Sequence, residues 1–538
     1  MSFNVEVIEE KKRILKVGKN VAEKLGILHL QHSNIRFGLK VADVNIEIDA
    51  NLGDDIHLAQ SIVHRLNLPV DCTYNIAVSN NELVIGPFIG IYMGRKETTL
   101  IKKLRIFHTY VANYKDLNGV IFAFTLDTVN KADLTMSGYY YNPKRDVWEK
   151  ATLPYPASIF RKNTYNTDWK EHFGSLYGDR IYNYKSINKW EMYDRLKQFP
   201  EVIKYLPHTS LYQTVDDVTE MLDKHGNVYV KPIEGKKGKG IYNIISSNNV
   251  ITVKTREKNE NVEWTFTNKD DFSSFLSVHL TKRKYIIQKT VELQIDNKVV
   301  DFRVGMDKDR LGNWQNFMFV SRVSGDNSIV SNRDISGGET KLIPDVLRDI
   351  YFMDEEMIEK HTKEFVSVAH TISKRLEETG LSLGKLAFDF AIDKNKDLWL
   401  IEVNSKFPDD SLMDEIDNKE TYFKIRHTNM EYAKMLAGFK HENYHTLSIT
   451  DNVRLELDEK IKLYIAMPKN EITNYRENIL EKTKVNGLHV TSTYNEKLKK
   501  FVVELVGQRE QIDTYLENIK QYDKIKPVVG LVNMTEEG

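Results

Sequence analysis

The chain has a single cysteine, almost no net charge and no long apolar run. Cys72 has no second cysteine to pair with, so an intramolecular disulfide and a zinc site built on several thiolates are excluded. The formal net charge is −1, which gives no overall basic field for nucleic acid or anionic lipid. No run of about 18 apolar residues occurs, and we expect neither a secretory signal nor a membrane-spanning segment. These absences favour a cytoplasmic protein without nucleic-acid or membrane partners, in which any basic site is local.

The rest of the composition is typical of a soluble globular protein. The 538 residues are 41% hydrophobic and 28% charged, and this length suits about three or four domains. We expect a multidomain protein of mixed α/β and α+β class. The predicted domains are a β-rich N-terminal domain (1–95), an α/β domain (96–185), a main domain (186–440) and a C-terminal domain (441–538).

Local patterns predict the elements of the outer domains. Apolar and polar residues alternate over residues 35–48, which predicts half-buried strands. Residues 55–66 and 100–111 read as helices, and residues 154–184 read as a connecting loop with short helical turns. The C-terminal domain shows the order strand, helix, hairpin, helix, strand, which predicts a ferredoxin-like (βαββαβ) sandwich.

The main domain has the densest succession of predicted elements. Asn188 is expected to cap its first helix, and Gly226 to end the second. The predicted helices are 189–198, 215–225, 270–280, 344–380 and 415–439, and the predicted strands are 228–230, 284–288, 299–306, 314–323, 386–392 and 398–403.

Residues 228–240 read VYVKPIEGKKGKG, a β-forming run followed by a loop rich in glycine and lysine. Gly235, Gly238 and Gly240 let backbone N–H groups turn toward one point, and the lysines add positive charge, which suits a polyphosphate. The loop is not a Walker A motif, because Ile and Tyr follow Gly240 where Lys and Ser or Thr are required. A hairpin that folds over phosphates and a flexible, solvated turn are both compatible with this stretch.

Two lysines and one strand end accompany the glycine loop. Lys189 begins a predicted helix and Lys231 ends the strand before the loop. Taken alone, Lys189 would be interpreted as an ordinary surface lysine, but it and Lys231 both precede the loop. Residues 288–292 read QKTVE. Free backbone groups of such a strand can pair with an adenine edge, and Glu292 could accept hydrogen bonds from ribose hydroxyls. An ordinary strand end is the alternative interpretation.

Arginines on two neighbouring predicted strands form the next cluster. Arg303 and Arg322 could point into one cleft, where guanidinium groups match phosphate and carboxylate geometry with paired donors. Asn332 lies in the following loop, SNRDISGG (331–338), whose low hydrophobic content is unusual for a purely structural insertion. The alternative is that the arginines are ion-paired on a sheet face.

Asp389 on one predicted strand and Glu402 and Asn404 on the next form the last cluster. Residues i and i+2 of a strand share a face, so Glu402 and Asn404 point the same way and Asp389 can oppose them. Two carboxylates and an amide oxygen are hard ligands suited to Mg²⁺ with ATP phosphates. The alternative is a set of hydrogen-bonded acids on the strands.

The order of these elements resembles the ATP-grasp superfamily over about residues 186–440, and within it the YheC/YheD family, which is associated with endospore coats. Arg36-Phe37-Gly38 and GPFIG at residues 86–90 also look like that family. The stretches SNRDISGGE and IEVNSKFPD are similar to those of the ribosomal-protein glutamate ligases within ATP-grasp. The predicted fold is therefore an ATP-grasp fold with a β-rich N-terminal and a ferredoxin-like C-terminal domain.

The resemblance implies a role for each cluster. It places Lys189 and Lys231 on the α- and β-phosphates of ATP, and Glu234, Gly235, Lys237, Gly238 and Gly240 in a loop over the β- and γ-phosphates. It places Gln288, Lys289 and Val291 beside adenine, Glu292 on the ribose, Arg303, Arg322 and Asn332 at the reaction centre, and Asp389, Glu402 and Asn404 on Mg²⁺.

The implied activity is that of an ADP-forming, ATP-dependent carboxylate–amine ligase that works through an acyl-phosphate. The implied cofactors are ATP and Mg²⁺, with two ions in this superfamily and Mn²⁺ as an alternative metal. The substrate would be an amino acid, a peptide or a protein, and spore association and a homo-oligomer are both left open. Lys406-Phe407 stands where the glutamate ligases have a small residue, Pro and Gly, so the substrate mouth is expected to differ. A small-molecule kinase and a non-catalytic, nucleotide-binding spore-coat or scaffold component remain the alternatives.

Overall fold

In the computed structural model the chain divides into two compact units, Met1–Tyr444 and His445–Gly538. None of the described helices combines the length and apolar character needed to cross a membrane. The structure describes residues 2–10, 12–79, 81–181, 183–235, 240–257, 260–280, 284–291, 294–295, 298–324, 338–406, 408–416, 418–439, 459–465, 489–495, 500–507, 514–515 and 528–530.

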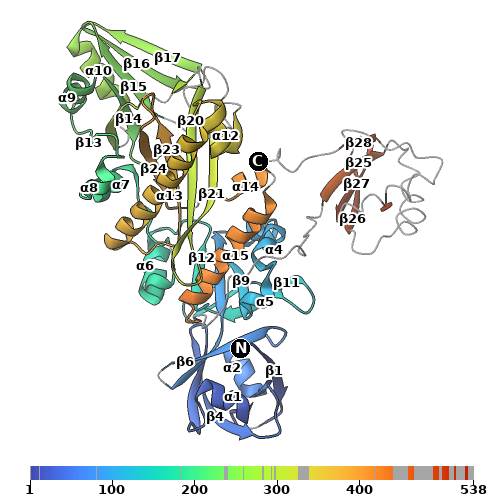
Figure 1. The fold of residues 1–538 in the computed structure, drawn as a ribbon. Helices are drawn as coiled ribbons and strands as arrows, with labels where there is room; N and C mark the ends of the chain where they lie inside the picture. Colours follow the sequence, from blue (N-terminus) through green and yellow to red (C-terminus); the bar gives the residue numbers. More distant parts are fainter. Residues whose placement is uncertain are drawn as a thin grey trace. The chain divides into compact units, whose positions relative to one another are not determined.

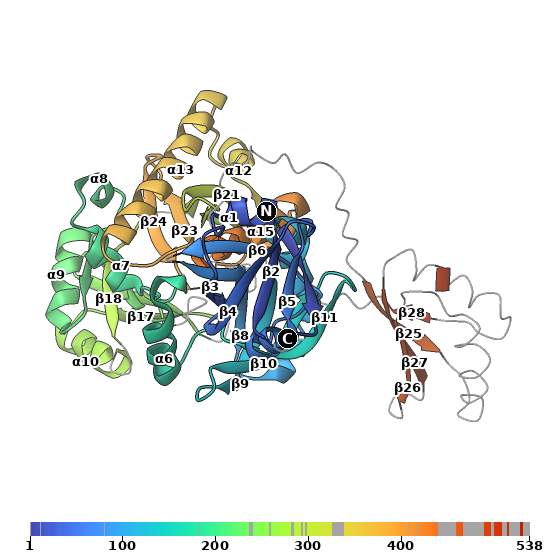
Figure 2. The ribbon, with the colours of Figure 1, turned by 90° about the horizontal axis from the view of Figure 1, so that it is seen from below.

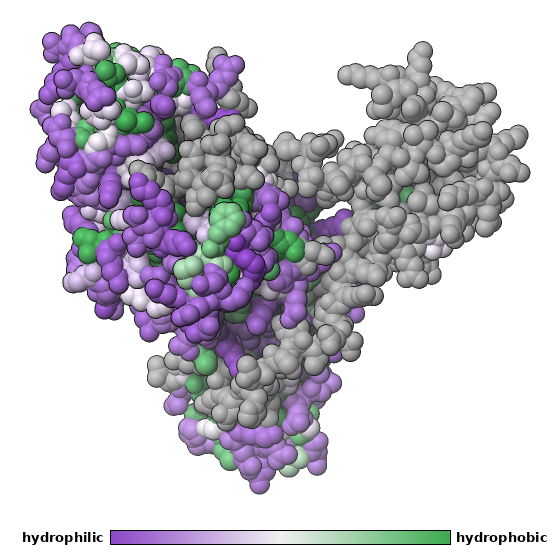
Figure 3. Space-filling view, turned by 45° about the horizontal axis from the view of Figure 1, so that its top comes forward, coloured by the Kyte–Doolittle hydropathy of each residue, from purple (hydrophilic) through white to green (hydrophobic). Residues whose placement is uncertain are grey.

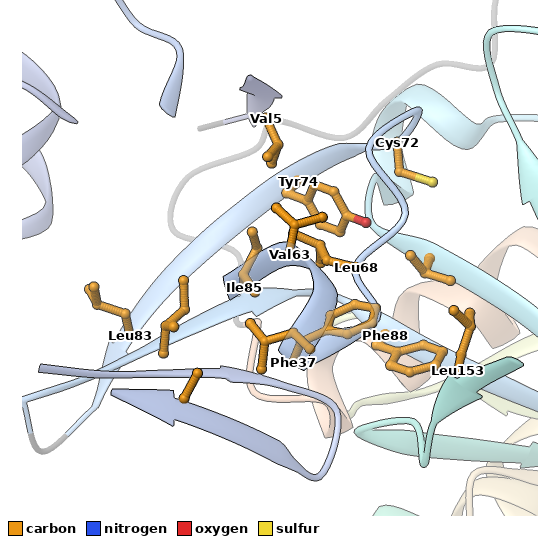
Figure 4. Close-up of a cluster of buried hydrophobic side chains, with 14 of the residues drawn as sticks. Val5, Phe37, Val63, Leu68, Cys72, Tyr74, Leu83, Ile85, Phe88 and Leu153 are labelled. Carbon is orange, nitrogen blue, oxygen red and sulfur yellow. The ribbon is translucent and has the colours of Figure 1, made fainter. Parts of the chain in front are cut away.

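The first unit begins with a closed β-barrel (Figure 1). Phe37 and Phe88 stack inside it with ring centroids 4.5 Å apart, and Tyr74 meets Phe37 edge to face (Figure 4). The strands pair in the order β1-β5-β2-β4-β3-β7-β6, and β6 pairs back with β1. They are β1 (Ser2–Ile8), β2 (Ile14–Gly18), β3 (His32–Phe37), β4 (Lys40–Asp49), β5 (Ile56–Ala59), β6 (Thr73–Ser79) and β7 (Glu82–Gly86), with helices α1 (Lys19–Leu25) and α2 (Gln60–Leu66).

The helix predicted at residues 55–66 is wrong in its first half. Residues 56–59 form β5, which pairs in parallel with β1 and antiparallel with β2, and the helix starts only at Gln60. Pairing with strands distant in sequence overrides the local helical pattern there.

A five-stranded sheet follows, in the order β11-β10-β9-β8-β12. The loop predicted at residues 154–184 is wrong, because it contains β12 and α6. Asn166 caps α6 by accepting a hydrogen bond from the Trp169 N–H group. The helix predicted at 100–111 is interrupted and forms α3 and α4. The elements are β8 (Phe88–Gly94), α3 (Glu97–Ile101), α4 (Leu104–Val111), α5 (Tyr114–Leu117), β9 (Val120–Asn130), β10 (Thr135–Asn142), β11 (Val147–Pro154), β12 (Ser158–Arg161) and α6 (Thr167–Tyr177).

The first sheet of the main domain has six strands in the order β13-β18-β14-β15-β16-β17, with α9 and α10 beside it (Figure 2). The predicted cap of α7 is confirmed, since Asn188 and Glu191 form a capping box. The predicted end of α9 is confirmed as well, with Gly226 at φ 68°. The elements are α7 (Lys189–Leu196), α8 (Pro200–Ile203), β13 (Thr209–Leu211), α9 (Val215–His225), β14 (Asn227–Pro232), β15 (Tyr242–Ser247), β16 (Val250–Glu257), β17 (Glu260–Phe266), α10 (Lys269–His279) and β18 (Tyr285–Lys289).

The second sheet of the main domain runs β22-β21-β20-β23-β24, with β19 added to β20. Phe302 and Phe390 on one face pack against Phe365 of the long helix α13 (Figure 1), so the other face carries the polar residues described below. The elements are β19 (Gln294–Ile295), β20 (Lys298–Lys308), β21 (Trp314–Val323), β22 (Glu339–Leu342), α12 (Ile343–Asp349), α13 (Glu355–Glu378), β23 (Lys385–Ile392), β24 (Leu398–Asn404), α14 (Ser411–Glu415) and α15 (Lys419–Leu436). Hydrophilic residues cover most of the described surface in the view of Figure 3.

The second unit contains a four-stranded antiparallel sheet in the order β26-β27-β25-β28. The predicted strands are confirmed, as β25 (Glu459–Ile465), β26 (His489–Asn495), β27 (Lys500–Gly507) and β28 (Val528–Gly530). The two predicted helices lie outside the described residues, apart from helical residues 514–515. The ferredoxin-like arrangement therefore stays a prediction.

Candidate active site

A row of charged side chains crosses the polar face of the second sheet. Arg303 on β20 lies opposite Asp389 on β23, and Asp389 lies opposite Glu402 on β24. Directly opposite residues of antiparallel strands share a face. Asn404, two residues beyond Glu402, donates its Nδ2 to Asp389 Oδ2 at 3.1 Å. The structure thus brings together all three residues predicted as metal ligands and places an arginine beside them.

Both predicted arginines contact Asp389. Arg303 donates from Nε and Nη2 to the two carboxylate oxygens of Asp389. Arg322 on β21 donates to Asp301 at 2.6 and 2.7 Å, and its Nη2 lies 3.3 Å from Asp389 Oδ2. Burial alone would raise the pKa of Asp389, but Arg303 and Arg322 hold it below its usual range. The arginines are ion-paired on the sheet face, as the alternative interpretation expected, and they converge on one carboxylate.

Two lysines reach the same row from outside the sheet. Lys189, the first residue of α7, places Nζ 3.1 Å from Glu402 Oε1. Lys231, on β14 of the first sheet, donates Nζ to Gln288 Oε1 at 2.8 Å. Burial and the nearby charge of Lys189 lower the pKa of Lys231 to about 8, and Glu402 opposes that shift. Glu402 therefore lies near two lysines from outside its sheet, one on α7 and one on β14.

The strand end predicted to border adenine is partly engaged within the protein. Gln288 is buried and donates Nε2 to Thr209 Oγ1 at 3.1 Å. The Lys289 N–H group donates to the His208 carbonyl at 2.8 Å, so it is not free for a base edge. Val291 is half-buried. Glu292 lies outside the described residues. The Gln288 amide thus orients Lys231 and is itself held by Thr209 of β13. The sequence did not indicate this positioning role of Gln288.

The glycine-rich stretch connects two antiparallel strands, as predicted. Strands β14 and β15 pair directly, and the exposed Glu234 and Gly235 follow the first of them. Gly240, before β15, has φ 75°, a left-handed conformation that favours glycine. Lys237 and Gly238 lie outside the described residues, as does Asn332.

The donors beside Asp389 fit a hard cation. Within the described part of the chain no three His, Cys, Asp or Glu residues group as a metal site, so the candidate set is two carboxylates and one amide. Asp389 Oδ2 receives Arg303, Arg322 and Asn404, whereas Oδ1 receives only Arg303 Nε among the described residues, so Oδ1 keeps a lone pair for a cation. Among the described residues, Glu402 accepts a side-chain hydrogen bond from Lys189 alone. Oxygen ligands of this kind suit Mg²⁺ bound together with phosphate.

Asp301 is the residue of the cluster to which the sequence analysis gave no role. It orients Arg322 through two hydrogen bonds across the β20–β21 pair. Asp301 and Arg303 are two residues apart on β20, a spacing at which strand residues share a face. The cross-strand partner of Arg322 depended on register, which the spacing alone does not give.

The family model described as "YheC/D like ATP-grasp" matches residues 178–436. This part of the chain is therefore similar to the YheC/D-like ATP-grasp domains. The predicted family is thereby confirmed, and the ATP-grasp domain includes every residue of the candidate active site. The match begins at residue 178, ahead of the predicted boundary at 186.

Two curated proteins of Bacillus subtilis (strain 168) are similar to the chain. "Endospore coat-associated protein YheD" is 27% identical over 430 residues, which covers 77% of this chain and 91% of that protein. "Endospore coat-associated protein YheC" is 20% identical over 293 residues, which covers 53% and 79%.

Solved structures resemble the chain more weakly. D-alanyl-alanine synthetase A from Vibrio cholerae matches with TM-score 0.37 and 10% identity over 64% of this chain and 99% of that one. N5-carboxyaminoimidazole ribonucleotide synthetase from Thermotoga maritima matches with TM-score 0.36 and 12% identity over 82% and 99%. Likeness at this level does not establish a common function.

Proposed function

We propose that the chain is an ADP-forming, ATP-dependent carboxylate–amine ligase that makes an amide bond through an acyl-phosphate. One observation carries the proposal: cationic side chains from four elements converge on the row Asp389–Glu402–Asn404. They are Arg303, Arg322, Lys189 and Lys231. The ATP-grasp domain match supports ATP as the source of the phosphoryl group.

The arginines serve the transferring phosphoryl group. Phosphoryl transfer spreads negative charge over the equatorial oxygens, and catalysis consists largely of positioning and electrostatic stabilisation. Arg322 is already oriented by Asp301, so its free edge can contact phosphate with little reorganisation. Arg303 can share its donors between Asp389 and the γ-phosphate, because guanidinium carries five N–H groups.

The lysines hold the other phosphates. Lys189 and Lys231 would contact the α- and β-phosphates, and the negative charge of those groups favours protonated Lys231. The loop around Gly240 would cover the phosphates and exclude water from the acyl-phosphate. Asp389, Glu402 and Asn404 would hold Mg²⁺, with one or two ions, or Mn²⁺ in its place. When bound, the metal would neutralise part of the negative charge of the phosphates.

The reaction balances without a protein nucleophile. A substrate carboxylate oxygen attacks the γ-phosphorus in line, the bond to the bridging oxygen breaks, and ADP leaves. An amine nitrogen then attacks the acyl carbon, expels inorganic phosphate and loses a proton, which leaves an amide. We propose an amino acid, a peptide or a protein as the substrate, and spore association from the names of the curated relatives.

The full chain incubated with Mg-ATP and mixed amino acids or an acidic peptide tests the proposal. We expect ADP release that requires both a carboxylate and an amine, with a product heavier by one residue. Glu402→Gln should abolish this release, and Lys360→Gln, an exposed lysine of α13, should not.

Other outcomes identify the alternatives. ADP release with a phosphorylated product and no amine requirement indicates a kinase. Nucleotide binding without ADP release contradicts both enzymatic functions and favours a coat component that binds nucleotide, which the names of the curated relatives also suit.

A further inference from the structure

A small recess lies where β12, the start of β23 and the segment after β24 meet. Its lining includes four cationic residues, Arg161, Lys162, Lys385 and Lys406, together with Asn183. None of the described residues that line it is acidic. A recess walled by this many cations attracts an anionic group.

Asn183 fixes the geometry of the recess. It has φ 54°, a left-handed conformation that asparagine tolerates. Its carbonyl accepts from Arg161 Nη2, and its Nδ2 donates to the carbonyls of Lys385 and Ser405, at 2.5 and 2.7 Å. Its Oδ1 accepts from the N–H groups of Gly384 and Lys385. Asn183 therefore holds β12 through its carbonyl, and β23 and the residue after β24 through its buried side chain.

The cations of the recess differ in how they are compensated. Lys385 is neutralised by Asp307 at 2.8 Å and Asp410 at 2.5 Å. The ammonium of Lys162 lies over aromatic rings, 5.5 Å from the Phe160 centroid, and the charge of Asp410 is shared between Lys385 and Lys162. Lys406 is exposed and has no ion-pair partner among the described residues. Positive charge at the mouth of the recess is therefore in surplus.

The recess adjoins the candidate active site. Lys406 follows Asn404 by two residues, and the Ser405 hydroxyl between them accepts from the Ile187 N–H group at 3.1 Å, just before Lys189. Lys385 and Asp389 lie on the same face of β23, separated on that face only by the small side chain of Ala387. All three residues are buried, so the recess and the row are joined at the surface by the segment from Asn404 to the exposed Lys406.

We infer that this recess binds a second carboxylate of the substrate, separate from the carboxylate that is activated. The inference rests on the proposed function and specifies its substrate as a dicarboxylic amino acid or a peptide with an additional carboxylate. Lys406 and Lys162 supply the charged donors, and Arg161 shapes the inner wall.

Binding without ATP tests the inference apart from turnover. The full chain is titrated calorimetrically with L-glutamate and with L-glutamine, which differ by one negative charge. We expect glutamate to bind about tenfold more tightly, and the double variant Lys162→Gln, Lys406→Gln to lose that preference, since a hydrogen bond to a charged group contributes about this much. Lys360→Gln should keep it. If the double variant lowers the unfolding midpoint, Lys406→Gln alone serves, because Lys406 is exposed.

Three results overturn the inference: no glutamate binding by the wild type, a glutamate preference that survives both substitutions, or inorganic phosphate that displaces glutamate with equal affinity. In turnover, the double variant should raise KM for the carboxylate substrate and leave KM for ATP unchanged. Glutamate binding that depends on charge, without any turnover, would contradict the proposed ligase activity and support the recess as a carboxylate-binding site. Normal turnover, together with glutamate binding that does not depend on Lys162 or Lys406, would support the proposed ligase and contradict the proposed role of the recess.

Discussion

Two polar clusters lie on the same face of the second sheet, four residues apart along β20 and β23. In one, the arginine is on β20 and the acid on β23, as Arg303 opposite Asp389. In the other the charges are exchanged between the strands, as Asp307 opposite Lys385. The residue types are alike, so the difference between the clusters must come from their surroundings.

The Asp307–Lys385 cluster is closed and balanced. Lys385 contacts both Asp307 and Asp410, and Asn429 from α15 donates to Asp307 at 3.0 Å. Burial would lower the pKa of Lys385, but the two carboxylates outweigh it and raise the pKa. Arg426, also from α15, lies 3.9 Å from Asp410. Helix α15 covers this cluster, which leaves no vacant donor for a ligand.

The Asp389 cluster is open and carries surplus positive charge. Among the described residues, four cations face the three carboxylates of Asp389, Asp301 and Glu402. An ATP phosphate would restore the balance. Charge balance and cover, not residue type, therefore separate a structural ion pair from a binding site on this face.

The largest expected effect is on stability, in the closed cluster. Lys385→Met leaves Asp307 and Asp410 buried without their cation, so the free energy of unfolding should fall by about 3–5 kcal/mol. Denaturant unfolding measures it. Lys360→Met on the exposed side of α13 is the control and should change stability by less than about 0.5 kcal/mol. A loss below about 1 kcal/mol for Lys385→Met would show that the pair is not essential to the fold.

The next effect is on turnover, in the open cluster. Asp389→Asn keeps the shape of the side chain but removes the charge that positions Arg303 and the proposed metal, so kcat should fall about 10²–10³-fold. Its unfolding free energy should change less than that of Lys385→Met, because Arg322 keeps Asp301. ADP release and denaturant unfolding are measured on both Asp389→Asn and Lys385→Met. Equal losses of stability in the two variants, with unchanged turnover in Asp389→Asn, would contradict the distinction between an open and a closed cluster.

The sequence predicted the open cluster better than the closed one. Period-2 spacing was enough to place Glu402 and Asn404 on one face of β24, and Asp389 on the neighbouring predicted strand was expected to oppose them. The helix starting at Lys189 was predicted from its capping residue and from Pro200 beyond its end. Each of these inferences depends on neighbours in sequence.

The closed cluster depends on contacts distant in sequence. Lys385 meets Asp410 from the segment after β24 and Asn429 from α15, and no local pattern indicates such partners. The same reason explains the missed β5 and β12, short strands that pair with β1 and β8. The recess around Asn183 was missed because three segments build it.

A smaller, pH-dependent effect is expected at Lys231. Its pKa in the folded protein, about 8, is below the value of about 10.4 in an unfolded chain. Between these values only the unfolded state binds the proton, so this lysine makes the free energy of unfolding rise with pH from about 8 to about 10. Nucleotide affinity should fall over the same range, because deprotonated Lys231 no longer attracts phosphate.

Comparison of the wild type with Lys231→Met measures both trends. The variant should lack the rise in stability and should bind ADP with a weaker pH dependence, as followed by denaturant unfolding and by calorimetry. Lys360→Met should retain both. Parallel pH profiles for wild type and Lys231→Met would place the titrating group elsewhere and remove Lys231 from the phosphate site.

The smallest expected effect compares two glycines of similar backbone conformation. Gly240, in the proposed phosphate loop, has φ 75°, and Gly226, at the end of α9, has φ 68°. Alanine at either position should lower the free energy of unfolding by about 1 kcal/mol, since an L-residue is strained there. Only Gly240→Ala should also raise KM for ATP, by roughly fivefold, because that strain would be relieved by moving the loop away from the phosphates. The opposite result is an unchanged KM for ATP in Gly240→Ala together with equal losses of stability in the two variants. It would mean that the loop is an ordinary solvated turn. The surplus positive charge around Asp389 would then bind phosphate without a covering loop.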